Sequence, residues 1–284
     1  MNVVFFGSSK FVIPIIEVLQ KNFDLALVVT TEKLPTDPVS SYCIKSKVCY
    51  YVVTDFRQKD VFDKLKEQHP DIAILASFGA IVSKSVLDIF KYGVLNIHPS
   101  LLPKYRGPTP VQTAILKGDK TTGVTIIKLD EQVDHGPILA QKKEAILEND
   151  TAESLYERLF KLSSGLIVQT IKLYLKEIFQ LREQNHPKAT FTKMLTRQDG
   201  YFDINNPPKP EILDRMIRAY YPWPGAWTQI RINDKARLPD GQGLRIKFLP
   251  ENRIQVEGKK PMSYKDFVNG YPEAAKNLEL IIQN

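Results

Sequence analysis

Short apolar runs alternate with amphipathic stretches along the first half of the chain. Each run ends at Gly or at polar residues, as buried strands do, and five of them lie at 2–6, 25–30, 48–53, 72–76 and 94–97. The stretches 10–20 and 61–68 between them repeat apolar residues at helical spacing. Strands that are apolar on both faces and separated by helices predict an α/β fold with a doubly wound, mostly parallel, Rossmann-like sheet.

The pattern changes from residue 121 onward. Two further strands are predicted at 123–129 and 138–146, joined by the sequence EQVDHGP. A long helix with apolar residues at helical spacing follows them. Asp150 or Thr151 is the expected N-cap of this helix, because short polar side chains at that position accept bonds from the first free backbone amides.

A polar, proline-containing stretch at 184–206 predicts a linker. Beyond it the chain shows one short helix near 211–219 and three short strands, predicted at 227–232, 244–249 and 253–257. The expected organisation is a first domain at 1–183, the linker at 184–206, and a small β domain with a basic surface at 207–284.

Composition adds a moderate basic bias. The 284 residues carry a formal net charge of +7, which fits a polyanionic partner and equally fits simple solubility. The chain has two cysteines, Cys43 and Cys49, and neither belongs to a C-x-x-C pair, so small thiols in a reducing compartment are expected and no metal site is. No apolar stretch reaches the length of a membrane span, and the N-terminus lacks the basic region of a signal peptide. We predict a cytoplasmic protein.

Asn96 and His98 stand at the end of the strand predicted at 94–97. Because they are two residues apart on an extended chain, both side chains point to one face. Ligands of open parallel sheets bind beyond the carboxyl ends of the strands. There an amide can donate to an oxyanion and an imidazole can handle a proton. A strand-end Asn bonded to backbone beside a packed His is the simpler alternative, and the adjoining Pro-Ser-Leu-Leu-Pro and Arg106-Gly107 favour the catalytic interpretation.

Asp134 lies in the turn predicted between 123–129 and 138–146. One interpretation is that its carboxylate returns to His98 and fixes the tautomer of the ring. The other is an ordinary turn Asp that bonds to its own backbone. His135 is a second acid–base candidate, and it ranks below His98 because no amide donor adjoins it.

Two loops that follow strands are candidate ligand sites. Gly7 and Ser8 end the first strand and open a helix, where backbone amides attract anions. Only one Gly is present there, so a G-x-G-x-x-G dinucleotide site is not expected. The sequence Ser77-Phe78-Gly79-Ala80-Ile81 follows the strand at 72–76 and could wall a flat aromatic ligand or form an ordinary tight turn.

Several of these motifs resemble those of the folate-dependent formyltransferases. NIHPSLLPKYRG, which begins at Asn96, looks like the family signature, and VDHGPIL supplies the matching Asp134. ASFGAIVSK at 76–84 resembles the folate-binding loop. KMLTRQDGYF at 193–202 and IRAYYPWPGAW at 217–227 are similar to the linker and C-terminal domain of methionyl-tRNA formyltransferases, as is the stretch 254–272.

The resemblance implies transfer of a formyl group from 10-formyltetrahydrofolate to the amino group of initiator methionyl-tRNA. Asn96 and protonated His98 would hold the oxyanion, and Asp134 would support His98 and help move a proton. The implied folate-binding residues are Phe78, Gly79, Ala80, Ile81, Ser100, Leu101, Leu102 and Pro103. The implied substrate- and tRNA-binding residues are Gly7, Ser8, Lys104, Arg106, Arg245, Lys247, Lys259 and Lys260. No metal and no obligate protein partner are implied, and a monomer is expected.

Two features depart from the family pattern. The stretch 30–43 is short and nearly uncharged, where the family has a basic, Gly-rich insertion that wedges at the tRNA acceptor end. The C-terminal domain is abbreviated between Trp227 and Arg253, too short for every strand of an OB barrel. Trp223 and Trp227 are expected in the core of this domain rather than at nucleic-acid bases.

The alternative functions share part of this sequence pattern. A formyltransferase acting on an amino sugar nucleotide would have the same catalytic residues, and the short stretch 30–43 favours it, whereas the linker and tail motifs oppose it. A non-catalytic RNA-binding protein on an inherited enzyme fold is opposed by the intact Asn96, His98 and Asp134. Glycinamide ribonucleotide formyltransferases typically lack the second domain.

Overall fold

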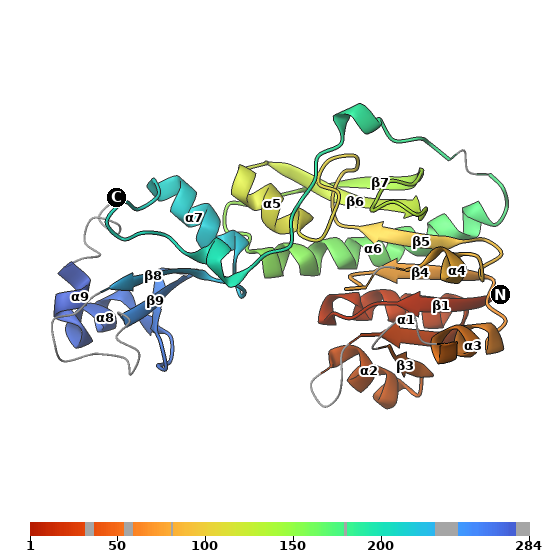
Figure 1. Cartoon of the computed structure of the whole chain (residues 1–284), viewed down its shortest axis with the longest axis horizontal. Coiled ribbons are helices and arrows are strands. Elements are labelled where there is room, and N and C mark those ends of the chain that lie inside the picture. The colour runs from red at the N-terminus through yellow and green to blue at the C-terminus, as the bar shows by residue number, and fades with distance from the viewer. Residues whose placement is uncertain (32–36, 54–58, 81, 179–180, 231–243, 277–284) are drawn as a thin grey trace. The chain divides into compact units, whose positions relative to one another are not determined.

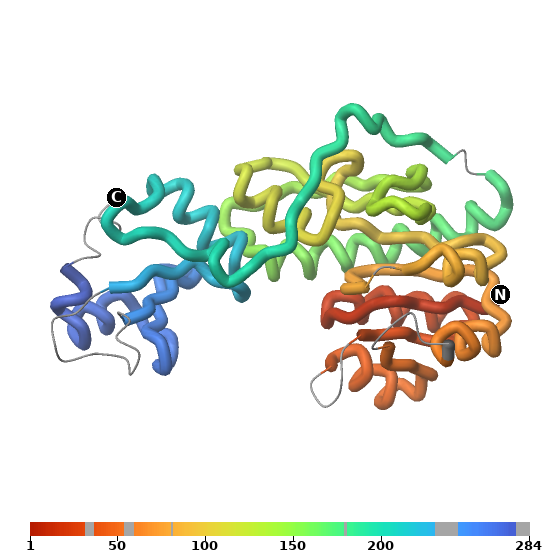
Figure 2. The backbone as a smooth tube through the Cα atoms, in the orientation of Figure 1, coloured from red at the N-terminus to blue at the C-terminus, as the bar shows by residue number. Residues whose placement is uncertain are grey.

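The computed structural model describes residues 1–31, 37–53, 59–80, 82–178, 181–230 and 244–276 (Figures 1 and 2). Its backbone divides into two compact units. The first contains Met1–Pro110, Thr121–Ala145 and Tyr156–Thr192. The second contains Val111–Lys120, Ile146–Leu155 and Lys193–Asn284.

A single sheet organises the first unit. Within the described residues it has seven strands in the order β3-β2-β1-β4-β5-β6-β7, seen as neighbouring arrows in Figure 1. Neighbouring strands from β3 to β5 are parallel, whereas β6 is antiparallel to both of its neighbours, β5 and β7. The strands are β1 (Asn2–Phe6), β2 (Asp24–Thr30), β3 (Tyr50–Val52), β4 (Ile72–Ala76), β5 (Val94–His98), β6 (Thr121–Lys128) and β7 (Ile138–Ala145). The predicted doubly wound, mostly parallel sheet is confirmed.

Helices lie between these strands, as the alternating pattern predicted, and a long helix follows the last of them. They are η1 (Lys10–Val12), α1 (Ile13–Asn22), α2 (Pro38–Ser46), α3 (Lys59–Glu67), α4 (Lys84–Leu87), α5 (Pro110–Lys117) and α6 (Ala152–Tyr174). Thr151 begins α6 as expected, because its Oγ1 accepts from the Ser154 amide at 3.1 Å. None of the described helices is both long and apolar enough to span a bilayer.

The stretch 30–43, described above only as short and nearly uncharged, contains the start of a helix. Residues 32–36 lie outside the described part, and α2 begins directly after them at Pro38. Asp37 caps this helix by accepting from the amides of Val39 and Ser40, both at 3.0 Å. The Asp-Pro pair, which is a start signal for a helix, was the feature in the sequence that could have revealed it.

The second unit contains a small antiparallel sheet in the order β11-β10-β9-β8. Its strands are β8 (Ala226–Ile230), β9 (Leu244–Leu249), β10 (Arg253–Val256) and β11 (Met262–Ser263). Besides α5, most of which falls in this unit, the described residues form the helices α7 (Pro210–Ala219), α8 (Tyr264–Gly270) and α9 (Pro272–Lys276) here. Phe202, Ile246, Phe248 and Phe267 share one buried cluster. Residues 231–243, inside the stretch predicted to be abbreviated, lie outside the described residues.

The segment that follows α6 does not begin as a free linker. Residues 182–192 belong to the first unit and run back along it, with backbone bridges from Arg182 to Ile138 and from Phe191 to Arg106 (Figure 2). A short 3-10 turn, η2 (His186–Lys188), lies within this segment, and another, η3 (Arg197–Gly200), follows it. The boundary between the compact units therefore falls after Thr192, and the division at 183 and 206 stays a prediction.

Candidate active site

Strand β5 carries Asn96 and His98 to the end of the sheet. Both side chains are buried, and β6 pairs with β5 so that Asn96 lies opposite Ile127 and His98 opposite Thr125. The alternation of an extended strand places the two side chains on the same face. The sheet therefore fixes an amide and an imidazole side by side.

Asp134 reaches both of these side chains from the turn after β6. One carboxylate oxygen, Oδ1, accepts from Asn96 Nδ2 at 3.0 Å. The other, Oδ2, accepts from the Gly107 amide at 2.7 Å and lies 3.4 Å from His98 Nδ1. The backbone of Asp134 has a φ of 50°, in the left-handed region that Asp tolerates better than most residues. The structure thus brings together the three residues that the sequence singled out as catalytic.

The His98 ring is held between two oxygen acceptors. Its Nε2 lies 2.8 Å from the Tyr105 carbonyl oxygen. A carbonyl can only accept, so Nε2 carries a proton. Nδ1 faces the Asp134 carboxylate, which can stabilise a second proton on the ring. Asn96 gives one amide hydrogen to Asp134 and has a second that can donate to a ligand.

Arg106, one of the residues expected to bind substrate, is buried. Only 4% of the residue is exposed. Its guanidinium donates to Gln184 Oε1 through Nε and Nη2, at 3.2 and 2.7 Å, and Nη2 also lies 2.9 Å from His186 Nδ1. Burial lowers the pKa of the guanidinium, and the nearby charges of Asp134 and Asp130 oppose that shift. Nε and Nη2 of Arg106 are thus bonded within the fold, and its expected role at the substrate stays a prediction.

The expected anion site at Gly7 and Ser8 is also used within the fold. The Gly7 amide donates to Val29 O at 2.9 Å and the Ser8 amide to Ser77 O at 3.1 Å. Ser8 Oγ pairs with Thr31 Oγ1 at 2.7 Å. A Cβ at Gly7 would lie 2.6 Å from the Phe5 ring, so packing requires a Gly at this position. The arrangement offers no free backbone cradle at these two residues.

The loop at 77–80 is the more open part of the expected folate site. Phe78 is half-buried with its ring edge-on to Phe6 at 5.4 Å, Ala80 is half-buried, and Gly79 is exposed with nothing within 4 Å of a Cβ position. Ile81 lies outside the described residues.

Residues of the other expected folate-binding segment, 100–103, alternate between buried and half-buried. Leu101 and Pro103 are half-buried, whereas Ser100 and Leu102 are buried. Ser100 Oγ donates to the Lys104 carbonyl at 2.6 Å, and the Leu102 amide donates to Thr125 Oγ1 at 3.1 Å. These bonds help to fix the shape of the loop that His98 precedes. Contact of the two residues with folate stays a prediction.

Among the residues expected to contact tRNA, Lys104, Lys259 and Lys260 are exposed and Lys247 is half-buried. Arg245 is held within the second unit. Its Nη1 donates to Glu257 Oε1 at 2.6 Å, and its guanidinium carbon lies 4.8 Å from the centre of the Trp227 ring.

The two tryptophans have opposite environments. Trp227 is 6% exposed, as predicted, and its Nε1 donates to Arg197 O at 3.0 Å. Trp223 is 56% exposed, so the prediction that it lies in the core was wrong. Pro222 and Pro224 flank it, and the direction of a side chain in such a turn cannot be read from hydrophobicity alone.

Three groups of the site were not predicted from the sequence. These are the Tyr105 carbonyl, the Gly107 amide and the Gln184 side chain. The first two lie inside the NIHPSLLPKYRG motif, but backbone groups leave no residue-type signal. Gln184 stands alone in a polar stretch and carries no motif. The Nδ1 of His135 lies 2.7 Å from Asp130 Oδ2, and its ring stacks on His186 with the ring centres 4.0 Å apart.

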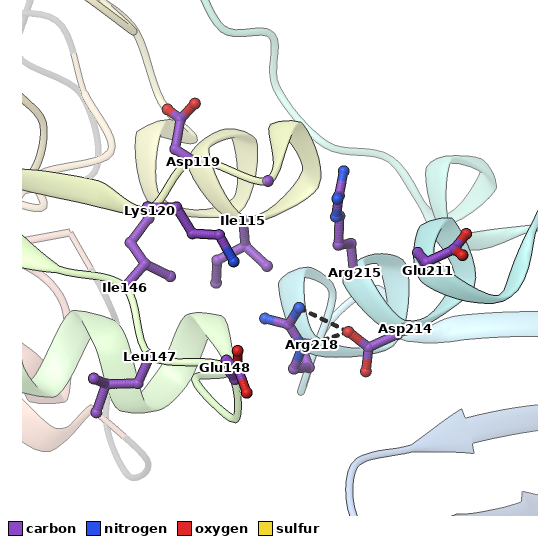
Figure 3. Close-up of a pocket in the computed structure, with 11 residues that line it drawn as sticks. Ile115, Asp119, Lys120, Ile146, Leu147, Glu148, Glu211, Asp214, Arg215 and Arg218 are labelled. Atoms are coloured by element: carbon purple, nitrogen blue, oxygen red, sulfur yellow. Dashed lines mark hydrogen bonds and ion pairs between the residues drawn. The ribbon is translucent and has the colours of Figure 1, made fainter.

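A separate hollow of about 300 Å³ lies within the second unit. Arg218 lines it, and its Nη2 pairs with Asp214 Oδ2 at 2.7 Å, as Figure 3 shows. Arg215, Lys120 and Glu148 also line it, so both charge signs face the hollow. No residue of the group around His98 contributes to it. Across the described ranges, no cluster of three or more His, Cys, Asp or Glu side chains could hold a metal ion.

The sequence and fold match known proteins. The family model described as formyl transferase matches residues 1–171. A methionyl-tRNA formyltransferase of Chloroflexus aggregans is 38% identical over 255 residues, which cover 87% of this chain and 79% of that protein. One of Koribacter versatilis is 34% identical over 310 aligned positions and covers 98% of both chains.

Two solved structures illustrate the likeness in fold. A sugar N-formyltransferase of a Shewanella species superposes with a TM-score of 0.68 at 20% identity, over 88% of this chain and 98% of that one. A phosphoribosylglycinamide formyltransferase of Bacillus halodurans gives a TM-score of 0.55 at 29% identity, over 62% of this chain and 96% of that one. By its family match and its relatives above 30% identity, the chain belongs to the formyl transferase family.

Proposed function

We propose that this protein transfers the formyl group of 10-formyltetrahydrofolate to the amino group of initiator methionyl-tRNA. The observation that carries the proposal is the extent of the likeness to methionyl-tRNA formyltransferases. With the Koribacter versatilis protein it covers 98% of both chains, and so it includes the second unit as well as the catalytic one.

The geometry around His98 suits acyl transfer to an amine. The amine forms a bond to the formyl carbon, the bond from that carbon to the donor nitrogen breaks, and the amine proton passes to the departing nitrogen. Asn96 has an amide hydrogen to place on the formyl oxygen as negative charge develops there. His98 shares its Nε2 proton with the Tyr105 carbonyl, and Asp134 can stabilise a second proton at Nδ1.

The surface beside these residues fits a flat donor ring. Phe78 is half-buried, Gly79 leaves its side open, and Leu101 and Pro103 are half-buried on the loop after His98. These residues would hold the folate, which supplies the formyl carbon. Ser100 and Leu102 would support this surface through the hydrogen bonds that shape the loop.

The acceptor is a polyanion, and the net charge of +7 favours its approach. Lys259 and Lys260 are exposed on the second unit and are our proposed backbone contacts, with Lys247 and Lys104 as further candidates. The proposal includes a monomer that acts in the cytoplasm on tRNA without an obligate protein partner.

The decisive experiment measures formyl incorporation from labelled 10-formyltetrahydrofolate into charged initiator methionyl-tRNA. Elongator methionyl-tRNA and an amino sugar nucleotide serve as parallel acceptors. We expect transfer to the initiator tRNA and little to the other two. Transfer to the sugar nucleotide alone would replace the proposal by the amino-sugar alternative, and tRNA binding without transfer to any acceptor would favour the non-catalytic one.

A further inference from the structure

The segment after α6 is fastened to the loop that follows His98. The Arg106 amide donates to Thr190 O at 2.8 Å, and the Thr192 amide donates back to Arg106 O at 2.7 Å. The Tyr105 amide donates to Thr190 Oγ1 at 2.8 Å. Tyr105 is the residue whose carbonyl holds the His98 ring, so this segment is part of the structure that shapes the site.

Gln184 is the side chain through which this segment reaches Asp134. It is 5% exposed, and its amide nitrogen donates to the carbonyl oxygens of Asp134 at 2.9 Å and Gly136 at 2.7 Å. Its amide oxygen accepts both bonds from the Arg106 guanidinium. Both amide hydrogens and both lone pairs of Gln184 are therefore used. One neutral side chain joins the turn of Asp134 to the loop of Arg106.

This connection matters because the Asp134 turn needs support. Its φ of 50° is sparsely populated by residues other than Gly, and such conformations persist where surrounding contacts determine them. Gln184 binds the carbonyl of Asp134 itself and the carbonyl two residues later. The carboxylate of the same Asp134 faces Asn96, His98 and the Gly107 amide. A shift of the turn would move that carboxylate relative to the imidazole.

We infer that Gln184 is a positioning residue that sets the Asp134 carboxylate against His98 by holding the Asp134–Gly136 turn. This inference rests on the proposed formyl transfer. Arg106 supports this role, because its guanidinium binds the amide oxygen of Gln184. The amide hydrogens of Gln184 are thereby directed toward the turn. The first residue of the predicted linker thus acts on the catalytic site of the first unit.

The first test compares Gln184→Met, which keeps the length of the side chain without its hydrogen bonds, with wild type. We expect kcat to fall by about 10- to 100-fold, since misplacement of a catalytic group by about 1 Å can cost that much. KM for 10-formyltetrahydrofolate should change by less than about twofold, because donor binding is not altered. Gln20→Met is the matched control, at an exposed position of α1, and should behave as wild type.

A second variant guards against failure of Gln184→Met to fold. Gln184→Glu keeps an acceptor for Arg106 and removes both donors to the turn, so we expect a comparable loss of kcat in protein whose circular dichroism matches wild type. If either folded variant retains kcat within about twofold of wild type, the inference is wrong.

A double-mutant cycle separates positioning from general support of the fold. In an Asp134→Asn background, Gln184→Met should lower kcat by less than about twofold further, because its effect passes through the carboxylate that is already gone. An equal loss in both backgrounds would overturn the inference and leave Gln184 a structural residue.

The inference can also be checked apart from the identity of the acceptor. If wild type formylates none of the acceptors, the proposed function fails, and ¹⁵N-histidine NMR then tests Gln184 alone. The ring nitrogen signals of His98 should move in Gln184→Met and not in Gln20→Met, with His98→Ala used for assignment. Unchanged His98 signals would refute the positioning role.

Discussion

Asn96 Nδ2 donates to Asp134 Oδ1 over 3.0 Å, although 38 residues separate the two along the chain. The bond orients the Asn96 amide, so that its second hydrogen has a fixed direction. The other oxygen of the same carboxylate meets the Gly107 amide and faces His98. Asp134 therefore orients two of the groups proposed to act on the formyl oxygen and the proton, and not only the imidazole.

Asp134→Ala should consequently lower kcat by more than the loss of a hydrogen-bond partner for His98 alone would. We expect kcat to fall at least as far as in Asn96→Ala, for which the loss of one oxyanion donor predicts about 100- to 1,000-fold. The affinity for 10-formyltetrahydrofolate, measured by fluorescence titration, should stay close to wild type in both variants. His98→Ala should behave in the same way. Near wild-type turnover in any one of the three would refute the role assigned to that residue.

Binding of tRNA should depend on exposed lysines and not on the buried Arg106. Replacing Lys259 and Lys260 by Gln should weaken binding and reduce the slope of log K against log salt by about 2, roughly one for each phosphate that a lysine no longer neutralises. The control is Lys21→Gln, an exposed lysine of α1 in the first unit, which should leave the slope unchanged. Filter binding at several salt concentrations measures the slope. An unaltered slope in the double variant would exclude these two lysines as phosphate ligands.

The two tryptophans allow a comparison of how a buried and an exposed side chain contribute to the free energy of unfolding. Trp227 is buried, its Nε1 is bonded to Arg197 O, and Tyr201 and Arg245 contact its ring. Trp227→Ala should lower the free energy of unfolding by about 3–5 kcal/mol, because apolar burial is removed and a cavity is left behind. Trp223→Ala, at an exposed position, should change it by about 0.5 kcal/mol or less. Denaturant titrations followed by circular dichroism compare them, and similar losses in both would contradict the burial difference.

The elements predicted correctly are those that can be recognised from their own residues. The apolar runs at β1, β4 and β5 indicate buried strands, because a strand covered on both faces must be apolar. Asn96 and His98 were located correctly because a strand end is a local feature. Asp134 required the resemblance to a family, since a turn Asp alone has a simpler explanation.

Side-chain environments that depend on distant contacts could not be predicted. Arg106 looks like a substrate ligand in sequence, whereas in the structure its Nε and Nη2 contact Gln184 and His186, about 80 residues later. Gly7 and Ser8 look like an anion cradle in sequence, but Val29 and Ser77 accept from their amides. Hydrogen-bond partners that lie far apart in the sequence leave no periodic pattern, so charge and glycine spacing could not reveal these internal contacts.

The start of the second unit should contribute to acid sensitivity through Asp199. The Lys193 ammonium, together with the amide and hydroxyl of Thr196, lowers the pKa of this carboxyl from 3.8 to about 2. Because the folded-state pKa is depressed, the stabilisation is present in full above the unfolded pKa and is lost as the pH falls through the folded one. Between about pH 4 and pH 2 the wild type should therefore lose stability more steeply than Asp199→Asn, which lacks this contribution at every pH. The control is Asp203→Asn, which replaces an exposed carboxylate a few residues further along the chain. It should keep the wild-type slope of stability against pH. Urea titrations at several pH values between 5 and 2 measure both slopes, and parallel curves for wild type and Asp199→Asn would show that the Lys193–Asp199 pair does not stabilise the folded state.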